Sequence, residues 1–103
     1  MPEPSSDKYS YHEGARAELL EATRYYAGQG GSLGSDFLDE VDRGIAFIIE
    51  NLEGGPVISA EGVRRKVLAR FPYSLLYLVE RDRIRIVTLM HHKRRPGYWT
   101  DRV

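Results

Sequence analysis

The spacing of apolar residues changes between Leu52 and Val63, and this change restricts the possible folds. From Ala15 up to it, apolar residues recur at the 3.6-residue period of amphipathic helices, and after it they alternate with polar residues as in half-buried strands. A helical half followed by a sheet half predicts an α+β domain rather than an alternating α/β one.

Two helices are expected in the first half. Ala15, Leu19, Ala22 and Tyr26 form one stripe, and the glycines of residues 28–31 end that helix because glycine accepts the left-handed conformation. A second helix, which Ser32 or Ser35 can cap, carries the more apolar stripe Phe37, Val41, Ile45, Ile48 and Leu52, widened by Leu38 and Ile49. The short turn between the helices predicts an antiparallel hairpin.

Four strands are expected. Residues 8–12 read as an edge strand, and residues 73–79 are apolar on both sides, as in a central strand. In residues 63–71 the apolar set Val67, Ala69 and Phe71 alternates with Arg64, Lys66 and Arg70, and in residues 83–91 Ile84 and Ile86 alternate with Arg83 and Arg85. The predicted order is β-α-α-β-β-β, a helical hairpin on one face of a small twisted, mainly antiparallel sheet, with arginines on the other face.

Length and composition bound the remaining possibilities. A chain of 103 residues fits one domain, expected over residues 8–103 after a flexible segment 1–7. The absence of cysteine excludes disulfides, thiolate metal sites and cysteine nucleophiles. No apolar run reaches the ~20 residues of a membrane span and no secretory signal is recognised, so a cytoplasmic location is expected.

Charge is divided unequally between the two halves. Residues 1–62 carry four bases and twelve acids, a net charge of −8, whereas residues 63–103 carry eleven bases and three acids, a net charge of +8. Such asymmetry predicts an acidic partner for the second half. The alternative is that both faces are solvated and pair with each other.

Three segments, taken in order, resemble a known family. They are ARAELLEATRYY with LGSDFLDEV (residues 15–26 and 33–41), RRKVLARFPYSLLY (residues 64–77) and IRIVTLMHHKRRPGYWTDR (residues 84–102). Together they resemble the RelE/ParE superfamily, the toxins of type II toxin–antitoxin pairs, over about residues 8–102. The resemblance implies the architecture predicted above and a cognate antitoxin that binds the toxin in a hetero-oligomer.

The superfamily contains two kinds of activity. RelE-like members cleave mRNA in the ribosome, and ParE-like members inhibit DNA gyrase. Cleavage needs a base, cations around the scissile phosphate and a proton donor. The resemblance puts Ser74 where RelE enzymes have a central-strand arginine, and Val67 where they have one of two lysines, the other falling on Arg65.

The C-terminal part of the motif is partly retained. Arg94 matches the arginine at the end of the last strand, whereas Thr100 aligns with the RelE tyrosine and Tyr98 lies two positions away. These departures favour a non-enzymatic, ParE-like inhibitor of DNA gyrase. The alternatives are a ribosome-dependent mRNA endoribonuclease, which would use Arg65, Arg94, Tyr98 and one of the two histidines His91 and His92, and a non-toxic binding module with the same fold.

Candidate target-binding residues are the cations of the sheet and of the segment after it, together with one aromatic residue: Arg64, Arg65, Arg70, Arg83, Arg85, Arg94, Arg95 and Trp99. Trp99 has a second interpretation, in which it folds back on the core. His91 is a candidate for acid–base work because it is a histidine, but alternatively it caps the last strand and packs against Tyr98 or Trp99. No metal or cofactor is expected, because His91 and His92 point to opposite faces and no phosphate-binding glycine motif occurs.

Overall fold

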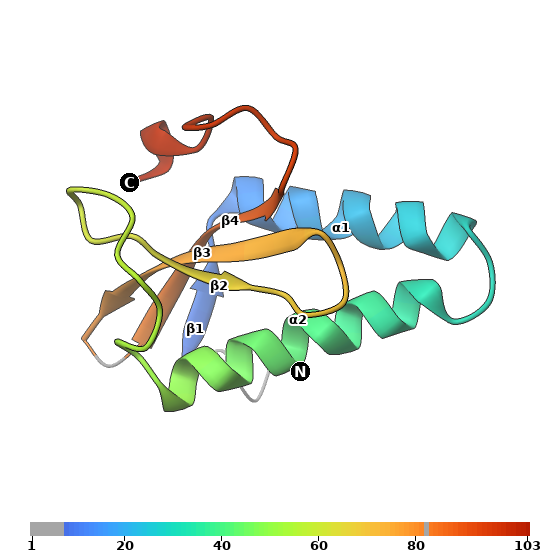
Figure 1. Cartoon of the computed structure of the whole chain (residues 1–103), viewed down its shortest axis with the longest axis horizontal. Coiled ribbons are helices and arrows are strands. Elements are labelled where there is room, and N and C mark those ends of the chain that lie inside the picture. The colour runs from blue at the N-terminus through green and yellow to red at the C-terminus, as the bar shows by residue number, and fades with distance from the viewer. Residues whose placement is uncertain (1–7, 82) are drawn as a thin grey trace.

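The computed structural model describes residues 8–81 and 83–103, so the expected flexible segment 1–7 lies outside the described part. The elements follow the predicted order (Figure 1). They are β1 (Tyr9–Tyr11), α1 (Glu13–Gly28), α2 (Leu33–Glu50), β2 (Arg64–Val67), β3 (Tyr73–Glu80), β4 (Arg83–His91) and a 3-10 turn (Thr100–Arg102). None of the described helices is long and apolar enough to cross a membrane.

The strands form one four-stranded sheet in the order β1-β4-β3-β2. β1 pairs with β4 in parallel, and β4, β3 and β2 pair antiparallel, which confirms the mainly antiparallel sheet. The register between β3 and β4 shifts after Leu76, so that Val87 is an extra residue in β4. β3 and β4 lie at the centre, which confirms the central position predicted for residues 73–79.

The helical hairpin covers one face of this sheet (Figure 1). The predicted stripe of α2 is its buried face, where Phe37, Val41, Ile45 and Ile48 are almost fully buried against the sheet. Ala15 and Ala22 do the same for α1. Leu38, expected to widen the stripe, is largely exposed instead.

A second, smaller core lies on the opposite face of the sheet. Val63, Leu76 and Val87 are buried there under Trp99, which is only 6% exposed. Trp99 belongs to residues 92–103, which follow β4 and are called the C-terminal tail below. The tail thus returns over the sheet, and the expectation that Trp99 folds back on the core is confirmed.

The prediction for the strand at residues 63–71 is wrong in extent and in its two faces. β2 ends at Val67, which is 49% exposed, and Ala69 is also exposed. Lys66 turns toward α2, with its Nζ 4.3 Å from the centre of the Phe47 ring. The long stem of Lys66 covers the apolar edge of α2 while its amine stays near water, so a cation can occupy the helix side of an edge strand.

Candidate functional site

The arginines of the expected basic sheet face do not form one continuous free surface, because several of them make structural contacts within the chain. Arg64 donates hydrogen bonds to the carbonyl oxygens of Glu53 and Gly55, at 3.0 and 2.7 Å, and so fixes the loop after α2. Arg70 pairs with Asp36 at 3.2 Å.

The two arginines of β4 also lie against polar groups of the chain itself. Arg85 donates to the carbonyl oxygen of Arg102 at 3.1 Å and lies 3.5 Å from the carboxylate of Glu80. Arg83 stands opposite Glu80 in the sheet register. Four of the predicted target-binding cations are therefore engaged with, or placed beside, groups of the chain itself.

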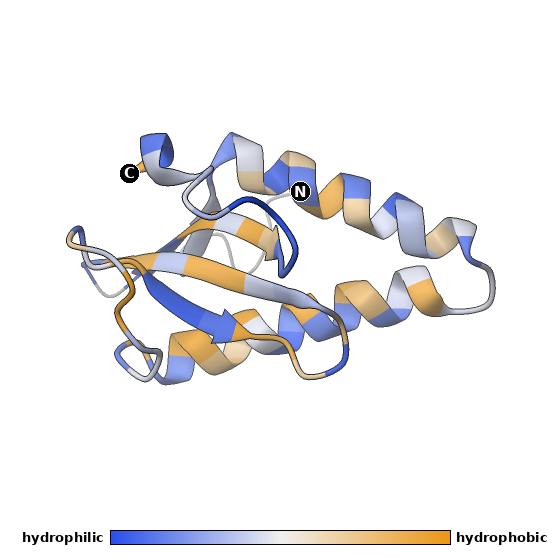
Figure 2. Cartoon of the chain, turned by 45° about the horizontal axis from the view of Figure 1, so that its top comes forward, coloured by the Kyte–Doolittle hydropathy of each residue, from blue (hydrophilic) through white to orange (hydrophobic). Residues whose placement is uncertain are grey.

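Three of the predicted cations are exposed and have no ion-pair partner among the described residues: Arg65 on β2, and Arg94 and Arg95 in the tail. Arg70 is exposed too, but it is paired with Asp36. The side chains of Arg65 and Arg95 make no hydrogen bond or ion pair with any residue that the structure describes. Trp99, predicted to join them, lies in the second core. The accessible cationic surface is thus smaller than the sequence predicts. Apart from the paired Arg70, it consists of one residue of β2 and the start of the tail, which is also among the most hydrophilic stretches of the chain (Figure 2).

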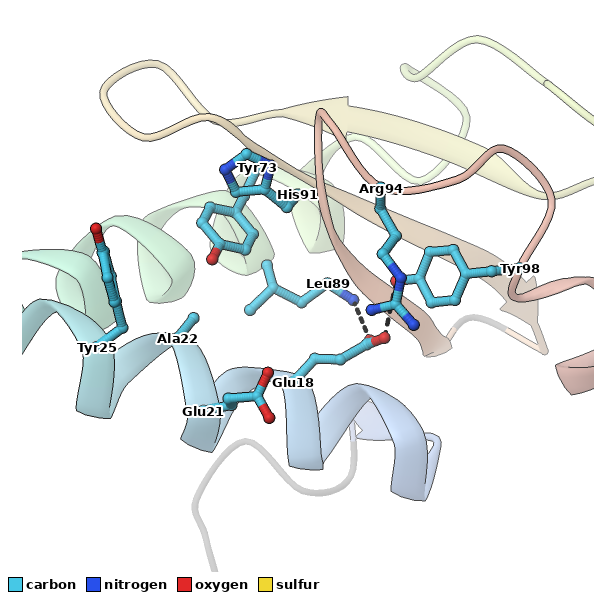
Figure 3. A pocket seen from close by; sticks show the side chains of 9 residues that line it. All are labelled: Glu18, Glu21, Ala22, Tyr25, Tyr73, Leu89, His91, Arg94 and Tyr98. Carbon is cyan, nitrogen blue, oxygen red and sulfur yellow. Dashed lines mark hydrogen bonds between the residues drawn. The ribbon is translucent and has the colours of Figure 1, made fainter.

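Arg94 lies at the edge of a hollow of about 350 Å³ between α1, the end of β4 and the tail (Figure 3). Its guanidinium carbon is 4.0 Å from the centre of the Tyr98 ring, a cation–π contact. Glu21 and His91 line other parts of the hollow. The structure therefore brings together three of the predicted residues, Arg94, Tyr98 and His91.

Glu18 of α1 is the centre of the polar contacts at this hollow. Its carboxylate accepts hydrogen bonds from Tyr98 Oη at 2.8 Å, from Thr88 Oγ1 at 2.9 Å and from the amide of Leu89 at 3.1 Å. Arg102 completes the set with both terminal nitrogens, at 3.0 and 3.1 Å. Burial alone would raise the pKa of Glu18, but the hydrogen bonds from Arg102, Tyr98 and Thr88 lower it below its usual value.

Sequence reasoning did not identify Glu18, Thr88 or Arg102. A signal existed for Glu18, because it lies three residues after Ala15 and four before Ala22, on the apolar stripe of α1. A carboxylate on a buried stripe needs partners. Nothing in the sequence indicated that those partners are Thr88 and Arg102, about 70 to 84 residues away.

Tyr98 is held as a hydrogen-bond donor. Burial, followed by the adjacent Glu18 carboxylate, raises the pKa of Tyr98 to about 12, although its contact with Thr88 opposes the increase. A phenol with so high a pKa, already donating to a carboxylate, is poorly suited to exchange a proton near neutral pH.

Ser74, which the resemblance aligns with the RelE central-strand arginine, is 1% exposed. Its Oγ lies 2.9 Å from His92 Nε2, and its cross-strand partner on β2 is Val67. Neither the Ser74 hydroxyl nor the Val67 side chain carries a positive charge, so these two positions supply no cation to this part of the sheet. His92 thus has a partner of its own and does not lie with His91.

His91 caps the end of β4, as one of its two interpretations predicts. Its Nδ1 accepts a hydrogen bond from the amide of Lys93 at 3.0 Å. The ring packs edge-on against Tyr73 at 5.0 Å, not against Tyr98 or Trp99, because Tyr73 is its direct partner in the sheet register. Within the described residues, no group of three or more histidine, aspartate or glutamate side chains could hold a metal ion.

A helical hairpin packed on a four-stranded sheet, followed by a tail that carries Arg94, is the architecture of the RelE/ParE superfamily. The chain is a member of this superfamily. Residues 9–96 match the family model described as the ParE toxin of the type II toxin–antitoxin system parDE, so the chain belongs to that family.

Comparison with solved structures agrees with this assignment at the level of the fold. A chain of the chromosomal ParDE toxin–antitoxin system from P. aeruginosa superposes with a TM-score of 0.69 at 20% identity. The match covers 82% of this chain and 94% of that chain. No curated protein sequence matches the chain significantly.

Proposed function

We propose that the chain acts as a toxin by binding DNA gyrase and inhibiting it, without cutting nucleic acid. The observation that carries this proposal is Ser74. At the position where a RelE-like nuclease requires an arginine, the chain has a buried hydroxyl bonded to His92. Val67 removes a second cation, and the Tyr98 phenol is committed to Glu18. A surface with these replacements retains groups for binding but lacks those for phosphodiester cleavage.

The binding surface in this proposal consists of the exposed cations Arg65, Arg94 and Arg95. Exposed arginines recognise acidic protein surfaces and are common among residues that dominate binding energy. Target binding is therefore expected to weaken as salt concentration rises.

A cognate antitoxin is the second partner in this proposal. The family description names a two-component system, and the solved ParDE structure is described as such a system. We infer that the antitoxin forms a hetero-oligomer with this chain in the cytoplasm, and that the complex does not inhibit the target.

The deciding experiment compares the two targets directly. The purified chain is added to DNA gyrase with relaxed plasmid, and separately to ribosomes translating a defined mRNA. Loss of supercoiling with intact mRNA is the expected result, and addition of antitoxin should restore supercoiling. Cleavage of mRNA at codon positions without an effect on gyrase would contradict the proposal. A folded chain without effect in either assay, or on growth, would indicate a binding module.

Arg94→Ala provides the residue-level test. This exposed side chain has a cation–π contact with Tyr98 and makes no hydrogen bond or ion pair with the described residues, so its loss should leave the thermal unfolding midpoint nearly unchanged. Gyrase inhibition should weaken by about tenfold, as for truncation of a residue that contributes more than ~1 kcal/mol to binding. Unchanged inhibition would show that the tail is not part of the binding surface.

A further inference from the structure

We infer that Glu18 is a positioning residue for Arg94, and that it acts through the ring of Tyr98. This inference rests on the proposed role of Arg94 in target binding. Neither Glu18 nor Tyr98 has to touch the target. Their role would be to hold the Arg94 guanidinium in one place before the target arrives, which reduces the entropy lost on binding.

The first step is the contact between Arg94 and Tyr98. The Arg94 guanidinium lies 4.0 Å from the ring centre, and the side chain makes no hydrogen bond or ion pair with any residue that the structure describes. An exposed arginine has many rotamers of similar energy, so the face of this ring is what selects one of them. The orientation of Arg94 thus depends on the orientation of Tyr98.

The second step is the contact that fixes Tyr98. Its hydroxyl donates to Glu18 Oε2 at 2.8 Å and also contacts Thr88 Oγ1. Two partners from different elements, Glu18 of α1 (Figure 3) and Thr88 of β4, hold the hydroxyl end, while the backbone of the tail holds the other end. The ring therefore depends on Glu18 for its place over the hollow.

The third step is the support of Glu18 itself. Arg102 balances its charge with two hydrogen bonds and also donates to the carbonyl oxygen of Val87 at 3.1 Å. Space for Arg102 exists because residue 14 is a glycine: a Cβ there would lie 2.6 Å from Arg102 Cζ. The contacts thus form a series in which Arg102 supports Glu18, Glu18 fixes Tyr98, and Tyr98 orients Arg94.

A double-mutant cycle distinguishes positioning from a general contribution to stability. Glu18→Gln removes the charge that pairs with Arg102 and weakens the hold on Tyr98. If Glu18 acts through Arg94, Glu18→Gln should raise the inhibitory concentration against gyrase about fivefold in the native background and leave it unchanged in the Arg94→Ala background. Equal effects in the two backgrounds would overturn the inference. Glu13→Gln, in the exposed first turn of the same helix, is the matched control and should have no effect.

A second measurement does not depend on the target. In NMR spectra of the full chain, the Arg94 δ-methylene protons should be shifted upfield by the ring current of Tyr98. Tyr98→Leu should abolish this shift, Glu18→Gln should reduce it, and Glu13→Gln should preserve it. A shift that survives Glu18→Gln unchanged would refute the positioning role even if gyrase is the target. If gyrase is not inhibited by the native chain but the shift behaves as described, only the proposed target is wrong.

Discussion

At the scale of single residues, Glu18 makes the fold sensitive to acid. Hydrogen bonds from Arg102, Tyr98 and Thr88 stabilise its charged form, so the pKa of Glu18 is lower in the folded chain than in the unfolded one. A carboxylate with a lowered pKa contributes stability above its unfolded pKa of about 4.3, and that contribution is lost as pH falls through the folded value.

We therefore expect Glu18→Gln to lower the free energy of unfolding by about 1–3 kcal/mol at pH 7, the usual cost of disrupting hydrogen bonds to a charged group. As pH falls below the unfolded pKa of about 4.3 and then through the lower folded value, the carboxyl group becomes protonated and resembles the amide, so the difference between variant and native chain should shrink. Urea unfolding curves between pH 3 and 7 measure this directly. A difference that stays constant over that range would contradict the assignment.

Gly55 and Gly28 give a matched pair at the same scale. A Cβ at Gly55 would lie 2.6 Å from the backbone oxygen of Arg65 and 2.7 Å from Tyr77 Oη, whereas a Cβ at Gly28 would meet nothing within 4 Å. Gly55→Ala should lower the free energy of unfolding by about 1–3 kcal/mol through steric overlap. Gly28→Ala, at the end of α1, should raise it by about 0.5–1 kcal/mol or leave it unchanged. Thermal unfolding of both variants checks the prediction, which fails if the two changes are equal.

At the scale of elements, Glu40 connects α2 to the turn between β2 and β3. Its Oε2 accepts hydrogen bonds from the backbone amides of Ala69 and Arg70, at 2.8 and 3.2 Å, and its Oε1 pairs with Arg43. A helix side chain thus supplies the partners that this turn cannot obtain from the sheet.

Glu40→Ala should therefore loosen the turn. We expect the free energy of unfolding to fall by about 1–2 kcal/mol, and the amides of Ala69 and Arg70 to exchange with deuterium faster than in the native chain. Asp39→Ala is the control, since Asp39 is exposed on the same helix and its replacement by alanine also raises helix propensity. Unaltered exchange at Ala69 and Arg70 would show that the turn is held by other contacts.

The elements also show where sequence patterns suffice. The helices and the central strands were predicted because each buries one continuous stripe or run, such as Phe37, Val41 and Ile45, and a local period records that burial. β2 was mispredicted because it is an edge strand beside the end of α2, where Lys66 and Val67 exchange the sides expected from polarity. The Glu18 contacts were missed because they join distant residues, and no period encodes such a contact.

At the scale of the whole molecule, the separation of charge is partly neutralised by folding. Two ion pairs, Glu18–Arg102 and Asp36–Arg70, connect the acidic first half to the basic second half. The alternative that the two halves pair with each other is therefore correct for these residues. The cations that folding leaves exposed, including Arg65 and Arg95, remain available to bind a partner.

These exposed cations lead to a prediction about the rate at which the chain binds its target. Long-range attraction between a cationic surface and an acidic target raises the association rate more than it lowers the dissociation rate. The double variant that combines Arg65→Glu and Arg95→Glu should therefore bind gyrase about tenfold more slowly at low salt. Its association rate should also depend less on salt concentration. Arg24→Glu, which reverses an exposed cation on α1, should leave both unchanged because it lies in the acidic half. Surface plasmon resonance at 50 to 300 mM NaCl, where the Debye screening length falls from about 14 to about 6 Å, would distinguish these outcomes. Slowing by Arg24→Glu in proportion to its smaller change in charge (−2 against −4 for the double substitution) would mean that net charge alone, and not the position of Arg65 and Arg95, governs the encounter.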